Sequence, residues 1–136
     1  MKALAGIIFS FILLASCAIN SAERNAAEMR FQRTIPICEG AKDCEFKWSM
    51  ARRWILDNAG FKLQNYNADY METFNVQDLA STKLWARVTK EPIDGERYRI
   101  LIEVGCNNMF GCGISLMEAK NNFNNVVNTQ LPDAQP

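Results

Sequence analysis

The chain has 136 residues, of which 49% are hydrophobic, and its fifteen basic side chains are matched by fifteen acidic ones. This balance lacks the basic excess on which nucleic-acid binding depends, so we expect no nucleic-acid partner. Histidine is absent, which removes the usual proton shuttle at neutral pH and the commonest metal ligand. We therefore expect no metal and no other cofactor, and no set of residues indicates a catalytic site.

The first residues, MKALAGIIFSFILLASC, combine one basic side chain, Lys2, with an uncharged and mostly apolar run. The run is shorter than the about 20 apolar residues that span a bilayer, but it suits the apolar core of a secretory signal. It ends in Leu14, Ala15, Ser16 and Cys17.

These four residues resemble the lipobox of bacterial lipoproteins, in which a branched apolar residue and two small ones precede an obligatory cysteine. The resemblance implies cleavage before Cys17 and a diacylglycerol thioether on its sulfur, so that acyl chains attach the protein to a membrane. In a Gram-negative cell, Ala18 in place of aspartate implies the outer membrane, on its periplasmic face. The alternative is an ordinary signal cut after Ala18, with Cys17 incidental.

Cleavage before Cys17 would leave 120 residues, enough for one domain and too few for two separate cores. We predict a signal peptide at residues 1–16, a lipidated terminus and tether at 17–28, a folded domain at 29–130 and a flexible tail at 131–136.

Within that domain, the hydrophobic pattern predicts a strand at 29–37, where Pro36 favours a sheet edge or the strand's end. Residues 43–59 follow a helical period, which Asp43 can cap at its start and Gly60 can close in a left-handed conformation. Four strands follow, with a hairpin turn at Asp94-Gly95 between the last two, and a second helix begins at Ser115 in a capping box with Glu118. The four strands are expected at 61–66, 70–76, 84–91 and 97–106.

This order of elements predicts an α+β fold, in which one antiparallel sheet carries two helices on one face. Alternation places Ala86, Val88, Ile100 and Ile102 inward. The order also resembles the helix-grip or TBP-like arrangement of several envelope lipoproteins, including an accessory lipoprotein of the outer-membrane barrel-assembly machine. That resemblance implies a fold and leaves the function open.

Four cysteines remain once Cys17 is assigned to lipid, and they form two C-x5-C pairs: Cys38 with Cys44, and Cys106 with Cys112. An even number in an exported domain indicates two disulfides. We favour these two local pairings because each intervening loop contains glycine, although crossed pairings remain open. A zinc site is less favoured, since zinc sites commonly use C-x2-C spacing with histidine. A redox pair would have C-x-x-C spacing.

Four side chains are candidates for binding: Trp85, Arg87 and Arg99 on the helix-free sheet face, and Phe110 at a loop tip. Aromatic and arginine side chains dominate interface energies. The alternatives are a solvated face with cross-strand pairs and a Phe110 that folds back over the core. Glu72 and Glu103 could form an acid–base pair, but we do not favour this role for them.

We therefore expect a non-enzymatic, lipid-anchored periplasmic domain that binds or helps assemble other envelope components, with an unidentified protein partner. A carrier that holds a small ligand between the sheet and the helices is the alternative. An enzyme that uses carboxylates or thiols is the third hypothesis.

The lipobox predicts that Cys17→Ala abolishes palmitate labelling and releases the protein from the membrane fraction, because the acylated sulfur is lost. Ser16→Ala is the matched control, since it keeps a small residue before the cysteine and should leave labelling intact. Unchanged labelling and fractionation of Cys17→Ala would contradict the lipoprotein assignment.

Overall fold

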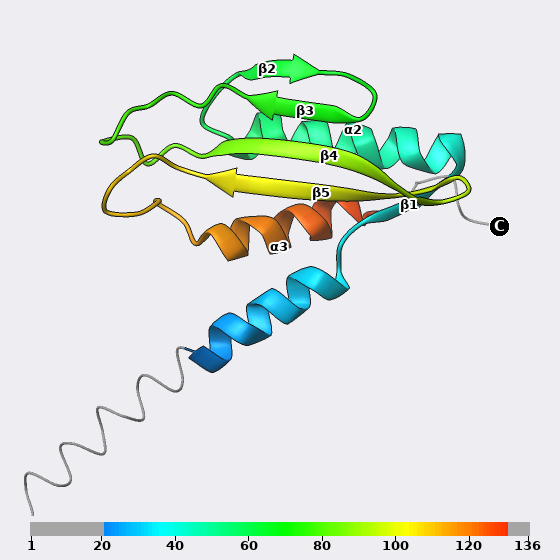
Figure 1. The fold of residues 1–136 in the computed structure, drawn as a ribbon, viewed down its shortest axis with the longest axis horizontal. Helices are drawn as coiled ribbons and strands as arrows, with labels where there is room; N and C mark the ends of the chain where they lie inside the picture. The colour runs from blue at the N-terminus through cyan, green and yellow to red at the C-terminus, as the bar shows by residue number, and fades with distance from the viewer. Residues whose placement is uncertain (1–20, 131–136) are drawn as a thin grey trace, which may run out of the picture.

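The computed structural model describes residues 21–130, so Cys17 with its lipobox and the tail at 131–136 lie outside the described part. Five antiparallel strands form one sheet in the order β1-β5-β4-β3-β2 (Figure 1). A helical segment at residues 21–33 precedes the first strand. The other elements are β1 (Ile37–Glu39), α2 (Gly40–Asn58), β2 (Leu63–Tyr66), β3 (Tyr70–Thr73), β4 (Trp85–Asp94), β5 (Arg97–Gly105) and α3 (Leu116–Val127). The predicted α+β class and the order from β1 to α3 are confirmed.

The β4–β5 hairpin defines the two faces of the sheet. Val88 pairs with Ile102 on one face, and Arg87 pairs with Glu103 on the other. Because successive side chains of a strand point to opposite faces, the first pair is buried and the second is exposed. The turn falls at residues 95–96, one residue later than the predicted Asp94-Gly95. The predicted inward and outward residues of both strands are confirmed.

Helices α2 and α3 pack on the same face of the sheet, as predicted. Trp54 of α2 meets Phe123 of α3 edge-on, with 5.4 Å between ring centroids and 89° between ring planes. Trp54 also donates a hydrogen bond from Nε1 to Asn122 Oδ1 at 2.7 Å. We call the opposite face, which α2 and α3 leave uncovered, the outer face. The core includes Cys38, Cys44, Trp48, Ala51, Trp54, Ile55, Met71, Ala86, Val88, Ile100, Ile102, Val104, Ala119, Phe123 and Val127.

The ends of α2 differ from the prediction. The helix begins at Gly40, and Asp43 lies one turn inside it, where its Oδ2 accepts a hydrogen bond from the Glu39 amide at 3.0 Å. At the other end, Gly60 does not adopt a left-handed conformation. It is needed for close packing instead, because a Cβ there would lie 2.5 Å from Cβ of Lys83. The Gly60 amide donates to the Leu84 carbonyl at 2.9 Å, which holds the two backbones together.

The predicted strand at 29–37 is wrong for most of its length, because residues 21–33 are helical and the strand is confined to Ile37–Glu39. The helix also replaces the described part of the predicted tether, residues 21–28. Alanine, glutamate, arginine and methionine dominate this segment and all favour helix. Phe31 lies buried, and the Lys120 ammonium stands 5.4 Å from its ring centroid. The alternation that suggested a strand therefore reflects one buried helical residue and the short strand after Pro36.

Helix α3 binds the N-terminal helical segment through its asparagines. Asn121 Nδ2 donates to the Ala27 carbonyl at 3.2 Å, and Asn124 Nδ2 donates to the Phe31 carbonyl at 3.1 Å. Ser115 caps α3 as predicted, with its Oγ accepting from the Glu118 amide at 3.4 Å.

The structure contains the two favoured disulfides, Cys38–Cys44 and Cys106–Cys112. The first joins β1 to the beginning of α2, and both of its cysteines are buried in the core. The second closes the loop after β5, and its cysteines are only partly buried.

We predict that replacing Cys38 and Cys44 together by serine destabilises the fold more than replacing Cys106 and Cys112. Each ring of about seven residues contributes roughly 2.4 kcal/mol through loop closure, but the first change also places hydroxyls in the core. Urea unfolding of the two double variants measures the difference. Thiol titration of the native protein is the control and should find none of these four thiols free. Equal losses, or four free thiols, would contradict this account.

Candidate functional site

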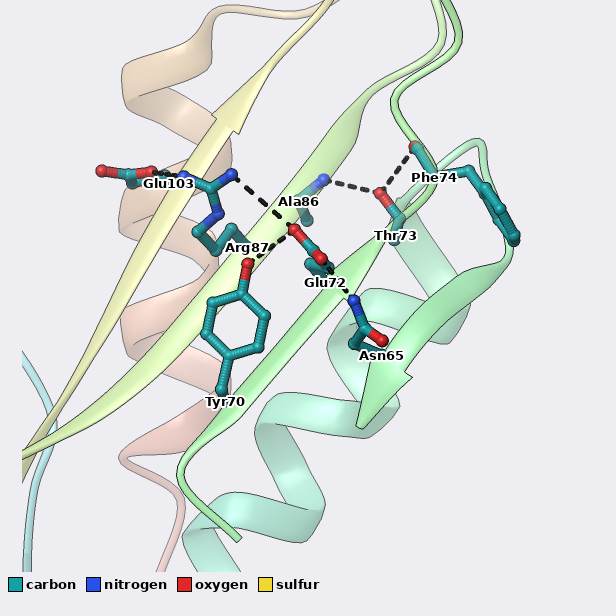
Figure 2. Close-up of polar contacts among 8 residues, drawn as sticks. All are labelled: Asn65, Tyr70, Glu72, Thr73, Phe74, Ala86, Arg87 and Glu103. Carbon is teal, nitrogen blue, oxygen red and sulfur yellow. Dashed lines mark hydrogen bonds and ion pairs between the residues drawn. The ribbon is translucent and has the colours of Figure 1, made fainter. Parts of the chain in front are cut away.

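A row of polar side chains crosses the outer face from β2 to β5 (Figure 2). We call Asn65, Tyr70, Glu72, Arg87 and Glu103 the outer-face network. Glu72 accepts hydrogen bonds from Tyr70 Oη at 2.6 Å and from Asn65 Nδ2 at 2.5 Å. The Arg87 guanidinium lies 3.7 Å from Glu72 Oε2 and 3.3 Å from Glu103 Oε2. One arginine therefore links two carboxylates that come from different strands.

Strand register accounts for this row. Asn65 pairs with Glu72, Glu72 with Arg87, and Arg87 with Glu103, so four neighbouring strands each place one polar side chain at the same level. Directly opposed side chains on one sheet face lie close enough to interact. Tyr70 reaches the row from two residues earlier on β3. The sequence identified Arg87 but missed Asn65 and Tyr70, because their place depends on pairing between strands that periodicity does not reveal.

The hydrogen bond from Tyr70, and next the one from Asn65, lowers the pKa of Glu72 below its ordinary value. The same bond raises the pKa of Tyr70, because the carboxylate holds the phenol proton. A general acid at neutral pH needs a raised carboxyl pKa, so Glu72 is shifted in the opposite direction. Glu72 and Glu103 also each contact Arg87, which lies between them. This geometry suits a fixed charge pattern better than proton transfer.

The other two predicted residues of this face lie on either side of the network. Trp85 covers Gly105, where a Cβ would lie 2.5 Å from the indole Cζ2. Arg99 binds Glu91, with Nη2 2.7 Å from Oε2. Arg99 pairs with Glu91, which lies six residues after Trp85 on β4. At about 3.3 Å per residue, Trp85 and Arg99 are therefore roughly 20 Å apart along the sheet. Trp85, Arg87 and Arg99 therefore share one face, along its length, without forming one cluster.

Phe110 points into solvent, so the alternative that it folds back over the core is wrong. Its side chain is 92% exposed, and that of the neighbouring Met109 is 70% exposed. The loop is nevertheless held in place, because Asn108 Oδ1 accepts from the Phe110 amide at 2.8 Å. Asn108 Nδ2 also donates to the Ala80 carbonyl at 3.0 Å. Phe110 therefore lies beyond the Trp85 end of the sheet, on a separate surface.

A cleft of about 470 Å³ lies between the sheet and the first half of α2. Lys90, on the inward face of β4, places its ammonium 5.6 Å from the Trp48 ring and 5.4 Å from the Tyr98 ring. The same ammonium lies 3.2 Å from Asp69 Oδ1. Lys90 was not predicted as part of a site, although a lysine that continues the buried positions of Ala86 and Val88 was a usable signal.

Among residues 21–130, no three histidine, cysteine, aspartate or glutamate side chains are placed to hold a metal ion. None of the helices in this described part is long and apolar enough to span a membrane. In comparisons with known proteins, no family model, curated protein or solved structure matches the chain.

We predict that Tyr70→Phe raises the pKa of Glu72 towards its ordinary value, because the largest cause of the lowered pKa is removed. A depressed carboxyl pKa stabilises the folded state above the unfolded value, and this contribution is lost as the pH falls through the folded value. The stability gap between the wild type and the variant should therefore be present at pH 7 and shrink below about pH 4.3.

Carboxyl NMR titration measures the pKa of Glu72, and urea unfolding at pH 7 and below about pH 4.3 measures the stability gap between the two proteins. Tyr66→Phe is the control, because it also removes a phenol hydroxyl, but from a ring that contacts Arg52. The Arg52 guanidinium lies 5.1 Å from the centroid of this ring. An unchanged Glu72 pKa in Tyr70→Phe, or the same shift in both variants, would contradict the assigned cause.

Proposed function

We propose that the protein is a non-enzymatic, lipid-anchored domain at the periplasmic face of the bacterial outer membrane, where it binds another envelope protein. The lipobox residues from Leu14 to Cys17 support the anchor. The two disulfides support export, since such bonds form and persist in oxidising compartments. The outer face supplies the binding surface.

The observation that carries the proposal is the ordered state of the outer face. Arg87 is fixed between two carboxylates while its side chain stays 47% exposed. An arginine that is already ordered loses less conformational entropy when a partner binds. Tyrosine, tryptophan and arginine are the residues that most often dominate binding energy. This face presents Tyr70 within the network and Trp85 and Arg99 on either side of it.

The charges of this face indicate what a partner would offer. Arg87 and Arg99 face three carboxylates, those of Glu72, Glu91 and Glu103. These five side chains together carry one excess negative charge, and the Glu103 side chain is 64% exposed. We infer a partner surface with a basic side chain opposite Glu103 and an apolar group opposite Trp85.

A small-ligand carrier receives less support from the cleft beside α2. The Lys90 ammonium already lies near both aromatic rings and forms an ion pair with Asp69. Unlike Arg87, whose side chain is 47% exposed, the Lys90 side chain is only 16% exposed, so a ligand that used the rings or the ammonium would have to displace contacts inside the protein. We therefore rank this function second.

Site-specific photo-crosslinking in cells tests the binding face. A photoreactive residue at position 85 or 99 should give discrete protein adducts, and Arg87→Ala should weaken both. Arg87 is a surface residue whose ion pairs are worth about 0–1 kcal/mol, so its loss should not unfold the domain. Position 56 is the control, because Leu56 is exposed on α2, away from the outer face. Adducts absent from positions 85 and 99, or equal at all three positions, would contradict the proposal.

A further inference from the structure

Two loops bring exposed apolar side chains to one end of the sheet. One loop joins β3 to β4, and the other joins β5 to α3 (Figure 1). The Met109 amide donates to the Leu79 carbonyl at 3.4 Å, and Asn107 Nδ2 donates to the Val76 carbonyl at 2.6 Å. The exposed apolar side chains of these loops and of the first residue of α3 include those of Leu79, Met109, Phe110, Ile114 and Leu116, and we call these five the apolar end.

The helical segment that leads to the membrane anchor begins beside this end. Glu23 and Ala27 line one hollow together with Ser115 and Met117, which stand at the beginning of α3. Ser115 directly follows the loop that carries Phe110. The first turns of the segment and the apolar end therefore lie next to each other, and Figure 1 shows both toward the same end of the molecule.

The length of chain before this segment limits its distance from the bilayer. Three residues separate Cys17 from Ser21, and the four extended steps from one Cα to the other reach at most about 14 Å. A chain acylated at Cys17 therefore keeps Ser21, and the neighbouring apolar end, close to the lipid headgroups. Amphipathic surfaces that bind membranes place their apolar side chains about 5–10 Å into the headgroup region, which is within this reach.

We propose that the apolar end rests in the headgroup region of the same membrane that holds the acyl chains, with the loop-tip side chains of Phe110 and Met109 inserted. This inference rests on the proposed lipid anchor and adds a second contact, which sets the orientation of the domain. A few apolar side chains bind lipid weakly alone, but a tether makes their contact intramolecular and raises the local lipid concentration. The Cys106–Cys112 bridge orders the loop in advance, which lowers the cost of insertion.

This orientation has a consequence for the outer face. Strands β4 and β5 run from the apolar end to the hairpin turn at residues 95–96. With the apolar end on the membrane, the turn points away from the bilayer, and the outer face stands accessible from the side. A partner that is itself held in the membrane then meets Trp85 first and Arg99 farther from the lipid.

Photo-crosslinking of the full chain in cells tests the inference, with a photoreactive residue at position 110 and phospholipid adducts detected by mass. Position 93 is the matched control, because Ile93 is also apolar and exposed but lies at the far end of β4. Lipid adducts from position 110 and none from position 93 are expected. Equal lipid adducts from both positions would overturn the proposed orientation. Adducts from position 110 to protein alone would show that a protein, and not the membrane, contacts the apolar end.

A second variant separates the contact from the anchor. Met109→Asp combined with Phe110→Asp changes exposed side chains and leaves both disulfides in place. It should abolish lipid adducts from a photoreactive residue at position 79, while palmitate labelling and the protein adducts from position 85 persist. Unchanged lipid adducts from position 79 would overturn the inference.

Palmitate labelling of the same samples distinguishes the two possible failures. A labelled, membrane-bound protein that gives no lipid adduct from position 110 overturns the inference and leaves the proposed anchor intact. An unlabelled protein in the soluble fraction overturns both.

Discussion

The register of the β4–β5 hairpin is the constraint on which the rest of the structure depends. A slip of one residue would move every side chain of a strand to the opposite face. If β4 slipped, Val88 would face solvent and Arg87 would be buried under the helices, and if β5 slipped, the same would happen to Ile102 and Glu103. Burying either charge without its partner would carry a large desolvation cost, so the core and the outer face select the same register. The outer-face network is thus a direct result of how the core is packed.

Stability and recognition are separated between the two faces. The buried face supplies most of the hydrophobic stabilisation, through side chains such as Trp54, Phe123 and Ile102. On the outer face, the pair of Arg99 and Glu91 is short, at 2.7 Å, whereas Arg87 is shared between two carboxylates at 3.3 and 3.7 Å. Exposed ion pairs contribute little to folding. The ion pairs of the outer face therefore add little to the stability of the fold. Substitutions there can change binding without unfolding the domain.

Periodicity in the sequence was enough to predict strands β2 to β5, both faces of the sheet and the two helices that cover it, but it misplaced most of the first strand. Spacing and glycine content also favoured the disulfides that the structure contains. Prediction failed where partners distant in sequence decide the outcome. The asparagines of α3 offered no hydrophobic signal, yet Asn121 and Asn124 bind carbonyls more than 90 residues earlier, at Ala27 and Phe31. The outer-face network was missed in part for the same reason, since Asn65 and Tyr70 acquire their roles only through strand pairing.

The exposed side chain of Phe110 is best understood together with the disulfide that closes its loop. A flexible loop could fold such a ring against the core and so remove it from water. The Cys106–Cys112 bridge and the bonds made by Asn107 and Asn108 hold the loop out, which prevents that rearrangement. The fold thus maintains an apolar surface that does not contribute to its own core, and large exposed patches of this kind commonly mark contact sites. The proposed lipid anchor would hold a bilayer within four residues of the described chain, and such a bilayer would cover this surface without requiring any change in the fold.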